Sequence, residues 1–137
     1  MIASRDLGVA TSYLNSGAYK PALKLAKRLQ KSHPRDPQPC NIAGICLSAM
    51  NKLPEAIAQF QRAMKIDPGF VDARHNLAQT LILAGRHTQA IRVVEPLRDG
   101  DATACFFLAQ AHVQLGDLTA ASAAIEQAVA LRPSFAP

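Results

Sequence analysis

The side chains best suited to chemistry are three cysteines, four histidines and a pair of neighbouring aspartates. Cys105 and His112 lie seven residues apart, which puts them on one helical face but about 10.5 Å apart along the helix axis. Zinc ligands bind at about 2 Å, so these two side chains cannot share one metal ion. Asp99 and Asp101 could form a catalytic carboxylate pair, but their spacing also fits a turn followed by a helix N-cap.

The other candidates lack partners for catalysis. Cys40 and Cys46 fall on different faces of one predicted helix, while His33 and His87 fall in predicted turns without a serine or cysteine arranged for nucleophilic attack. No glycine-rich segment has the form of a phosphate-binding loop. We therefore predict that the chain is not an enzyme, with no catalytic residue, no metal ligand and no cofactor.

Length and composition indicate one domain of ordinary size. A chain of 137 residues with 49% hydrophobic residues can bury one continuous core. It contains no run of about 18 apolar residues, so we predict no membrane span. Met1 to Arg5 are not followed by an apolar signal segment. Three cysteines, an odd number, favour a reducing compartment, and we predict a cytoplasmic location.

The chain is organised around a run of small and large apolar residues: Cys40, Ala43, Gly44 and Leu47, then Ala56, Phe60, Ala63 and Pro68. Small residues at 44 and 56 allow two antiparallel helices to approach closely, while Leu47 and Phe60 fill the space between them. Pro68 ends the second helix because it lacks an N–H and disfavours a helical residue before it. This pattern resembles the 34-residue tetratricopeptide repeat.

The same pattern recurs along the chain. Four copies are predicted, at about 3–36, 37–70, 71–101 and 102–135, within a single domain 1–137 that we interpret as part of a longer protein. The small position of the second helix is taken by Ala22, Ala56, Ala90 and Ala121, and the position four residues later by Ala26, Phe60, Val94 and Ile125. The turn within each copy holds Gly17, Asn51, Gly85 and Gly116, residues that tolerate a left-handed backbone. The predicted fold class is all-α, an α-solenoid of stacked antiparallel hairpins with about eight helices.

The resemblance implies a function as well as a fold. In this family the first helices of successive repeats line a concave groove, so we expect a non-catalytic scaffold that binds a peptide or helix of a partner protein. Phe106 and Phe107 diverge by about 100° on their helix, so we expect one in the core and the other in the groove. The predicted partner-binding residues are Asn41, Ile45, Ser48, His75, Asn76, Gln79, Ile82, Phe106, Phe107, Gln110 and Gln114.

A second candidate surface is a basic stripe on the second helix. Its members are Lys20, Lys24, Lys27, Arg28 and Lys31. Residues 1–36 hold seven Lys or Arg against two Asp, whereas residues 37–137 hold eight of each sign. One interpretation is a solvated outer face that keeps a terminal repeat soluble. The other is a binding site for an acidic partner or a nucleic acid; the lack of interleaved aromatic residues in that helix disfavours nucleic acid.

Three further features leave alternatives open. Pro96 stands inside the second helix of the third copy, so that helix either ends early near Glu95 or bends there. The last helix, 118–131, carries Glu126 as its only charge and could mediate self-association. Asn76-Leu77-Ala78 resembles one element of the repeat arrays of glycosyltransferases. An alternative function is therefore a substrate-recruiting or oligomerising arm of a larger transferase.

Overall fold

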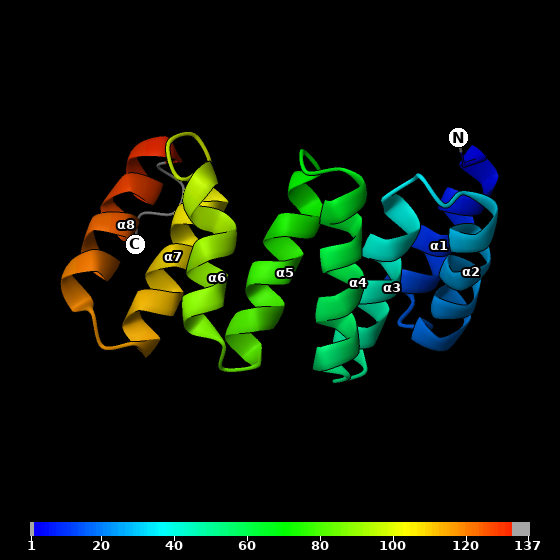
Figure 1. The fold of residues 1–137 in the computed structure, drawn as a ribbon, viewed down its shortest axis with the longest axis horizontal. Coiled ribbons are helices and arrows are strands. Elements are labelled where there is room, and N and C mark those ends of the chain that lie inside the picture. The colour runs from blue at the N-terminus through cyan, green and yellow to red at the C-terminus, as the bar shows by residue number, and fades with distance from the viewer. Residues whose placement is uncertain (1, 133–137) are drawn as a thin grey trace. The chain divides into compact units, whose positions relative to one another are not determined.

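The computed structural model describes residues 2–132, and this part of the chain contains eight α-helices, one 3-10 helix and no strand (Figure 1). The prediction of an all-α chain with about eight helices is confirmed. The end of the fourth predicted copy, 133–135, lies outside the described residues. The helices are α1 Ser4–Asn15, α2 Tyr19–Ser32, α3 Gln38–Ala49, α4 Leu53–Ile66, α5 Val71–Leu83, α6 His87–Val94, η1 Glu95–Leu97, α7 Ala102–Gln114 and α8 Leu118–Leu131.

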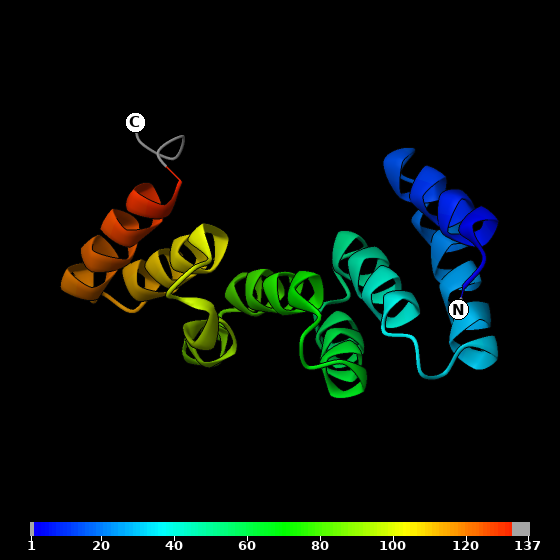
Figure 2. The ribbon, with the colours of Figure 1, turned by 90° about the horizontal axis from the view of Figure 1, so that it is seen from above.

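The chain divides into two compact units, residues 1–76 and 77–137, and the boundary falls within α5. In the first unit α1 packs on α2, α2 on α3, and α3 on α4. In the second unit α6 packs on α7, and α7 on α8. Figure 2 shows the helices of each unit lying beside their neighbours in chain order. Each unit is therefore built from helices that are close in sequence, as expected for a repeat protein.

The turn within each helix hairpin adopts the predicted left-handed conformation. The φ angles are +75° at Gly17, +77° at Gly85 and +80° at Gly116. Asn51, which occupies the same position in the second hairpin, has a φ of +60°. These are positions where a Cβ is costly, and asparagine tolerates them better than most other residues.

Close helix packing depends on the small residues, as predicted. Ala22, Ala56 and Ala90 are fully buried, and Ala121 is 4% exposed. Gly44 lies directly under the ring of Phe60, which is itself buried. The packing of α3 on α4 therefore depends on a glycine opposite a large aromatic side chain.

The cores consist mainly of alanine and branched aliphatic side chains. In the first unit Leu25 and Leu29 of α2 pack with Ala10, and a second cluster joins Cys40 to Ala63. In the second unit the central buried residues are Ala78, Val94, Ala104, Leu108, Ala109 and Ala124. Because these side chains are small, the helices approach closely and the core is thin.

Pro96 ends helix α6. The helix stops at Val94, and residues Glu95–Leu97 form a single 3-10 turn. Arg98 follows and links this turn to α8, because its Nε donates to Oε1 of Gln127 at 2.7 Å while Gln127 Nε2 donates to the Arg98 carbonyl at 3.2 Å. Of the two alternatives for this proline, an early helix end describes the structure.

The predicted helix caps are correct at Asp101 and displaced by one residue at Asp36. Asp101 Oδ1 accepts a hydrogen bond from the Ala104 backbone N–H at 3.0 Å, which makes it the N-cap of α7. The sequence predicts Asp36 as N-cap with Pro37 as the first helical residue, but α3 begins at Gln38. Asp36 nevertheless accepts from the Gln38 N–H at 2.9 Å, so its side chain satisfies a backbone donor of the first turn.

Candidate interaction surfaces

The first surface is formed in the first unit by side chains of α3 and the beginning of α5. Asn41, Ile45 and Ser48 follow one another at i, i+4 and i+7, so they share one face of α3. Asn76 Nδ2 donates a hydrogen bond to Asn41 Oδ1 at 3.0 Å, which joins the two helices through their amides. His75 is half-buried next to Asn76 on α5. The structure thus brings Asn41 and Asn76, two of the predicted binding residues, into direct contact.

The second unit carries the remaining predicted binding residues. Gln79 on α5 is exposed, as are Phe106, Gln110 and Gln114, which share one face of α7, whereas Ile82 is half-buried. Phe107 packs against the buried cluster of the second unit. Phe106 is 40% exposed, with its ring centroid 6.4 Å from that of Phe107. The prediction that the two phenylalanines occupy different environments is therefore confirmed.

Phe106 also belongs to an apolar recess against α8. With Ile125, Ala128 and Val129 it lines a cavity of about 240 Å³. Other apolar side chains of α8 face solvent: Leu118 is 66% exposed and Leu131 is 41% exposed. Ile125, at the position that Phe60 fills in the second copy, is 41% exposed rather than buried. The outer face of α8 is thus apolar, as its sequence indicates.

The basic residues of α2 surround a hollow between α1 and α2 with a volume of about 530 Å³. Its floor is formed by Val9, Tyr13 and Leu25, with Pro21 at one end. Its rim consists of Lys24, Lys27, Arg28 and Lys31. We call this floor and rim together the basic hollow.

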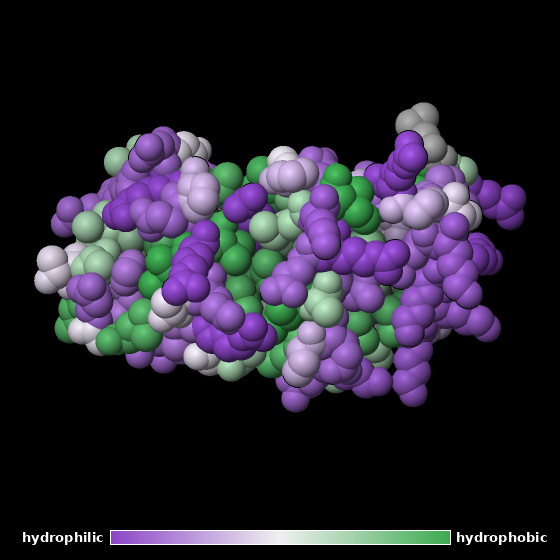
Figure 3. All heavy atoms as spheres, in the orientation of Figure 1, coloured by the Kyte–Doolittle hydropathy of each residue, from purple (hydrophilic) through white to green (hydrophobic). Residues whose placement is uncertain are grey.

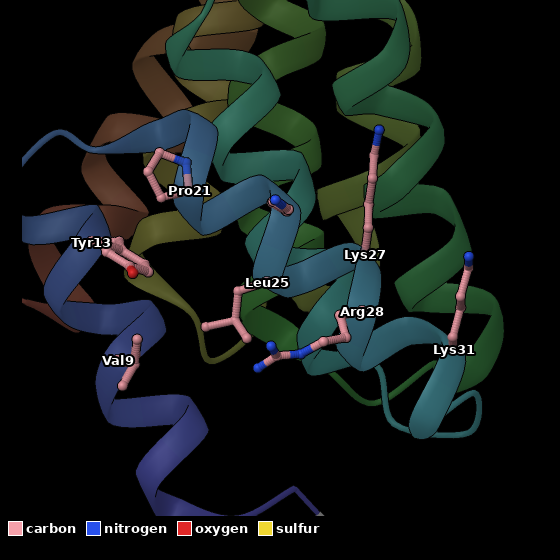
Figure 4. A pocket seen from close by; sticks show the side chains of 8 residues that line it. Val9, Tyr13, Pro21, Leu25, Lys27, Arg28 and Lys31 are labelled. Carbon is pink, nitrogen blue, oxygen red and sulfur yellow. The ribbon is translucent and has the colours of Figure 1, made fainter.

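Figure 4 shows how the basic hollow is built. Val9 and Tyr13 project from α1 toward α2, and Arg28 extends beside Leu25 on the same side. Lys27 and Lys31 leave α2 in a different direction and form the far part of the rim. Figure 3 shows a predominantly hydrophilic surface over α2.

One member of the predicted stripe stands apart from the basic hollow. Lys20 lines a different recess next to the turn at Gly17, together with Tyr19 and Met50. One rim cation has an acidic neighbour: Oδ1 of Asp6 lies 3.9 Å from a guanidinium nitrogen of Arg28. The Arg28 side chain is 71% exposed, so this ion pair contributes little to stability and leaves the guanidinium accessible.

The cysteines are buried and their chemistry is suppressed. Burial raises the pKa of the Cys46 thiol from 9.0 to about 11, and it also raises the pKa of Cys40 and Cys105. The Cys105 thiol donates to the Arg98 carbonyl, with 3.2 Å between sulfur and oxygen. The nucleophilic thiolate is therefore scarce at neutral pH.

The described residues form neither a metal-binding cluster nor a membrane-spanning helix. Between Ile2 and Arg132, no group of three or more His, Cys, Asp or Glu side chains is close enough to hold a metal ion. None of the helices in that range is both long enough and apolar enough to cross a membrane.

Sequence reasoning found the basic rim but missed the floor of the hollow. Val9 and Tyr13 are four residues apart, which places both on one face of α1. Leu25 and Arg28 are three apart on α2. These spacings could have indicated an apolar strip beside the basic one. Whether the apolar strip is accessible to a ligand depends on its neighbours in the folded chain, which the residue spacing within one helix does not identify.

Comparisons with known proteins agree on the family. A family model described as tetratricopeptide repeat matches residues 47–103, and a second model of the same description matches residues 102–135. Together they cover the last three predicted copies except for the first helical turns of the second. No curated protein sequence matches the chain significantly.

Solved structures with the same fold include three from different sources. MamA from Desulfovibrio magneticus RS-1 is 24% identical, with a TM-score of 0.82 over 93% of this chain and 74% of that chain. TTC0263, a thermophilic tetratricopeptide repeat protein of Thermus thermophilus, is 19% identical, with a TM-score of 0.78 over 90% and 71%. A chain of the Cut9–Hcn1 hetero-tetramer of APC/C is 27% identical, with a TM-score of 0.78 over 90% of this chain and 24% of that one.

The repeat pattern, the hairpins with their left-handed turns and both family matches therefore lead to one assignment. The chain belongs to the tetratricopeptide repeat family, and its fold is the all-α solenoid of helix hairpins on which that family builds protein-interaction scaffolds.

Proposed function

We propose that the chain is a non-catalytic scaffold that binds an extended peptide or a helix of a partner protein through the first helices of its repeats. The observation that carries the proposal is the hydrogen bond between Asn41 and Asn76. It joins amide groups from the first helices of two successive repeats. Amides of this kind can donate to and accept from the backbone of an extended peptide.

The fixed geometry of this amide pair favours binding. A side chain that is already ordered loses little rotamer freedom when a ligand arrives. Ile45 lies one turn beyond Asn41 on α3 and is half-buried, so it offers an apolar contact beside the amides. We propose that this patch, Asn41, Ile45, Ser48, His75 and Asn76, is the ligand-contacting part of the first unit.

In the second unit we propose a corresponding patch on α5 and α7. Gln79, Gln110 and Gln114 supply exposed amides, and Phe106 supplies an apolar anchor with 40% of its surface accessible. Exposed aromatic side chains are frequent anchors in protein interfaces because they bury a large area with few rotatable bonds. Ile82 and Phe107 are half-buried, and we propose that their accessible parts add apolar contacts to this patch.

Selection from a peptide library tests the proposal. Random peptides of about 12 residues, long enough for an extended or helical ligand, are selected on the 137-residue chain and their affinities measured by fluorescence anisotropy. We expect a double Gln79→Ala, Gln110→Ala variant to lose at least about tenfold in affinity, because each removed hydrogen bond contributes about 1 kcal/mol. Both side chains are exposed, so the melting temperature should not change.

The matched control is Gln61→Ala with Ser122→Ala, two exposed polar residues on the second helices α4 and α8. This variant should bind the selected peptides as the wild type does. If both double variants lose affinity equally, or if the selected peptides compete poorly with one another, the first helices do not form the binding surface.

We further propose that copies of the chain associate through α8. Exposed Leu118, Ile125 and Leu131 on that helix support this second role, because a large apolar face on a soluble domain is costly unless it is covered. The cavity beside Phe106 would receive an apolar side chain of the other copy.

The compartment that we propose is the cytoplasm. Cys40, Cys46 and Cys105 are free thiols, which suits a reducing environment. Microscopy of a fluorescent fusion, together with cell fractionation, tests this location; accumulation in a secreted fraction would contradict it.

A further inference from the structure

We propose that the basic hollow between α1 and α2 is a second docking site, which binds an acidic amphipathic helix of a partner protein. In the bound state an apolar side chain of that helix enters the hollow over Val9 and Leu25, and flanking carboxylates face the basic rim. The site shares no residue with the patches on the first helices that we propose for peptide binding.

The apolar part of the site is the floor. Val9 is 39% exposed, although it faces the hollow beside the half-buried Tyr13. Leu25 closes the bottom and is 7% exposed. With a volume of about 530 Å³ the hollow can receive an apolar side chain of the partner. Covering this strip removes apolar surface from water, which favours binding in proportion to the area buried.

The charged part of the site is the rim. Four cations line the hollow, and the ion pair between Arg28 and Asp6 is long and exposed. Residues 1–36 carry a formal net charge of +5, from seven Lys or Arg and two Asp, whereas the rest of the chain is neutral. The net positive charge of the whole protein is thus carried by residues 1–36, which include the helices that form the hollow, and it would steer an acidic partner toward it.

The spacing of the rim matches a helix. Lys24, Arg28 and Lys31 stand at i, i+4 and i+7, so they span about 10.5 Å along the axis of α2. Glutamates at i, i+4 and i+7 of a partner helix span the same length. A helix laid along α2 can therefore place carboxylates opposite Lys24 and Arg28 while its neighbouring stripe faces the floor. Lys31 leaves α2 in a different direction and adds positive charge at the far part of the rim.

A ligand that presents only phosphate groups would match the basic rim but not the apolar floor. A nucleic acid or an anionic membrane surface would contact Lys24 and Arg28 but would leave the apolar floor without a role. The described helix α2 has Tyr19 at its start and no aromatic residue among the four rim cations, so α2 itself offers no platform for stacked bases. The ring of Tyr13 in the floor belongs to α1 and is half-buried. The combination of an apolar floor with a basic rim favours a protein ligand.

The test uses the 137-residue chain and a defined probe. The probe is a fluorescein-labelled synthetic helix of about 14 residues, with glutamates at i, i+4 and i+7 and leucines on the adjacent stripe. We expect it to bind the wild type, and to lose at least about tenfold in affinity with Lys24→Gln plus Arg28→Gln. We also expect a loss of about tenfold with Val9→Ser, which leaves every charge in place. A probe with serine replacing each leucine should bind the wild type as weakly as the original probe binds the Val9→Ser variant.

The matched control variant is Lys52→Gln with Lys65→Gln, which removes the same charge from exposed positions at α4. It should bind the probe within about twofold of the wild type. Circular dichroism and thermal melting establish that each variant is folded; Lys24, Arg28 and Val9 are all exposed, so none should unfold the chain.

Four results would overturn the proposal. The first is the absence of binding at low salt, and the second is an equal loss of affinity in the control variant. The third is tighter binding to mixed-sequence RNA or to phosphatidylserine vesicles, lost with Lys24→Gln plus Arg28→Gln but not with Val9→Ser; this would assign the rim to phosphates. For RNA contacts to four phosphates the slope of log affinity against log salt would be about −3 to −4. The fourth is self-association that the Lys24 and Arg28 changes abolish, which would make a second copy the occupant.

Discussion

The ring of Phe60 occupies the space in which a side chain at residue 44 would begin. A Cβ placed on Gly44 would lie 2.5 Å from Cε1 of Phe60 and 2.7 Å from two more ring carbons. Side-chain Cβ atoms essentially never approach another carbon so closely, so α3 and α4 can pack as they do only because residue 44 has no side chain. The glycine and the phenylalanine are therefore one packing unit.

This relationship predicts the effect of Gly44→Ala. Alanine in a helix interior is normally about 1 kcal/mol more stable than glycine, but here the ring must shift, and overpacking costs about 1 to 3 kcal/mol. We expect a net loss of about 1 kcal/mol in the free energy of unfolding, measured by urea denaturation. The matched control is Gly8→Ala in α1, where no heavy atom lies within 4 Å of the added Cβ and the chain should become more stable.

The third copy suggests a compensating change. The corresponding positions there hold Ala78 and Val94, which are both buried in one cluster. Phe60→Val alone should cost about 2 to 3 kcal/mol through the cavity that it leaves. Combined with Gly44→Ala it should cost at least about 1 kcal/mol less than the sum of the two single changes. Additive effects would show that the two side chains are not coupled.

The left-handed turn at Asn51 predicts a difference between small substitutions. Asn51→Ala should lower the free energy of unfolding by about 1 kcal/mol, because a Cβ without a local hydrogen-bonding group is strained at a φ of +60°. Asn51→Gly should be neutral or stabilising, since the other hairpins have glycine there. Thermal melting of both variants checks this; an alanine variant as stable as the glycine variant would contradict it.

The buried thiol of Cys46 predicts a loss of stability at alkaline pH. Its pKa is raised from 9.0 to about 11 in the folded chain, so the unfolded chain releases this proton at a lower pH than the folded chain does. The contribution of the protonated Cys46 thiol to the free energy of unfolding is therefore intact below about pH 9. It is lost as pH rises from about 9 to 11, at up to about 1.4 kcal/mol per pH unit.

Cys46→Ala isolates this effect, because the wild type and the variant differ only at this residue. We expect the stability difference between wild type and variant to shrink as pH rises through this window, measured by urea denaturation at several pH values. A difference that stays constant from pH 8 to about 11 would show that the thiol is not protected.

The apolar face of α8 predicts the behaviour of an Ile125→Glu variant. If copies associate through this face, the wild type should show a mass that increases with concentration, and the variant should stay monomeric because a carboxylate cannot enter the apolar recess without cost. Multi-angle light scattering measures both. Glu126→Gln, also on α8, is the control and should associate as the wild type does. A monomeric wild type at all concentrations would contradict the proposal.

Much of the fold could be predicted because its determinants are local and repeated. The turns at Gly17, Gly85 and Gly116 each require a backbone that few residues adopt, and a fixed spacing of small residues marks where helices approach. Pro96 restricted α6 to an early end or a bend near Glu95 for an equally local reason, since proline cannot continue the helical hydrogen-bond pattern. The structure has the early end.

The candidate sites could be predicted only in part because exposure is a tertiary property. Helical spacing placed Lys24 and Arg28 on one stripe, but it could not show that Val9 and Tyr13 of another helix form a floor beside them. For Phe106 and Phe107 the sequence required different environments without deciding which residue packs against the core and which is exposed. That choice depends on α8 and on the side chains packed below α7.

The short link after Pro96 explains how the third copy can lack three residues. In the first unit Gln30 of α2 donates to Gln59 of α4, and in the second unit Arg98 donates to Gln127 of α8; each donor and acceptor are 29 residues apart. The acceptor Gln59 is the eighth residue after the turn residue Asn51, whereas the acceptor Gln127 is the eleventh residue after the turn residue Gly116. A displacement of three residues rotates by about 300° around a helix, only about 60° short of a full revolution. The absence of three residues from the third copy therefore changes which side chain of α8 is the acceptor, but nearly the same side of α8 still faces Arg98. The absence of only one or two residues would have rotated that side of α8 away from Arg98.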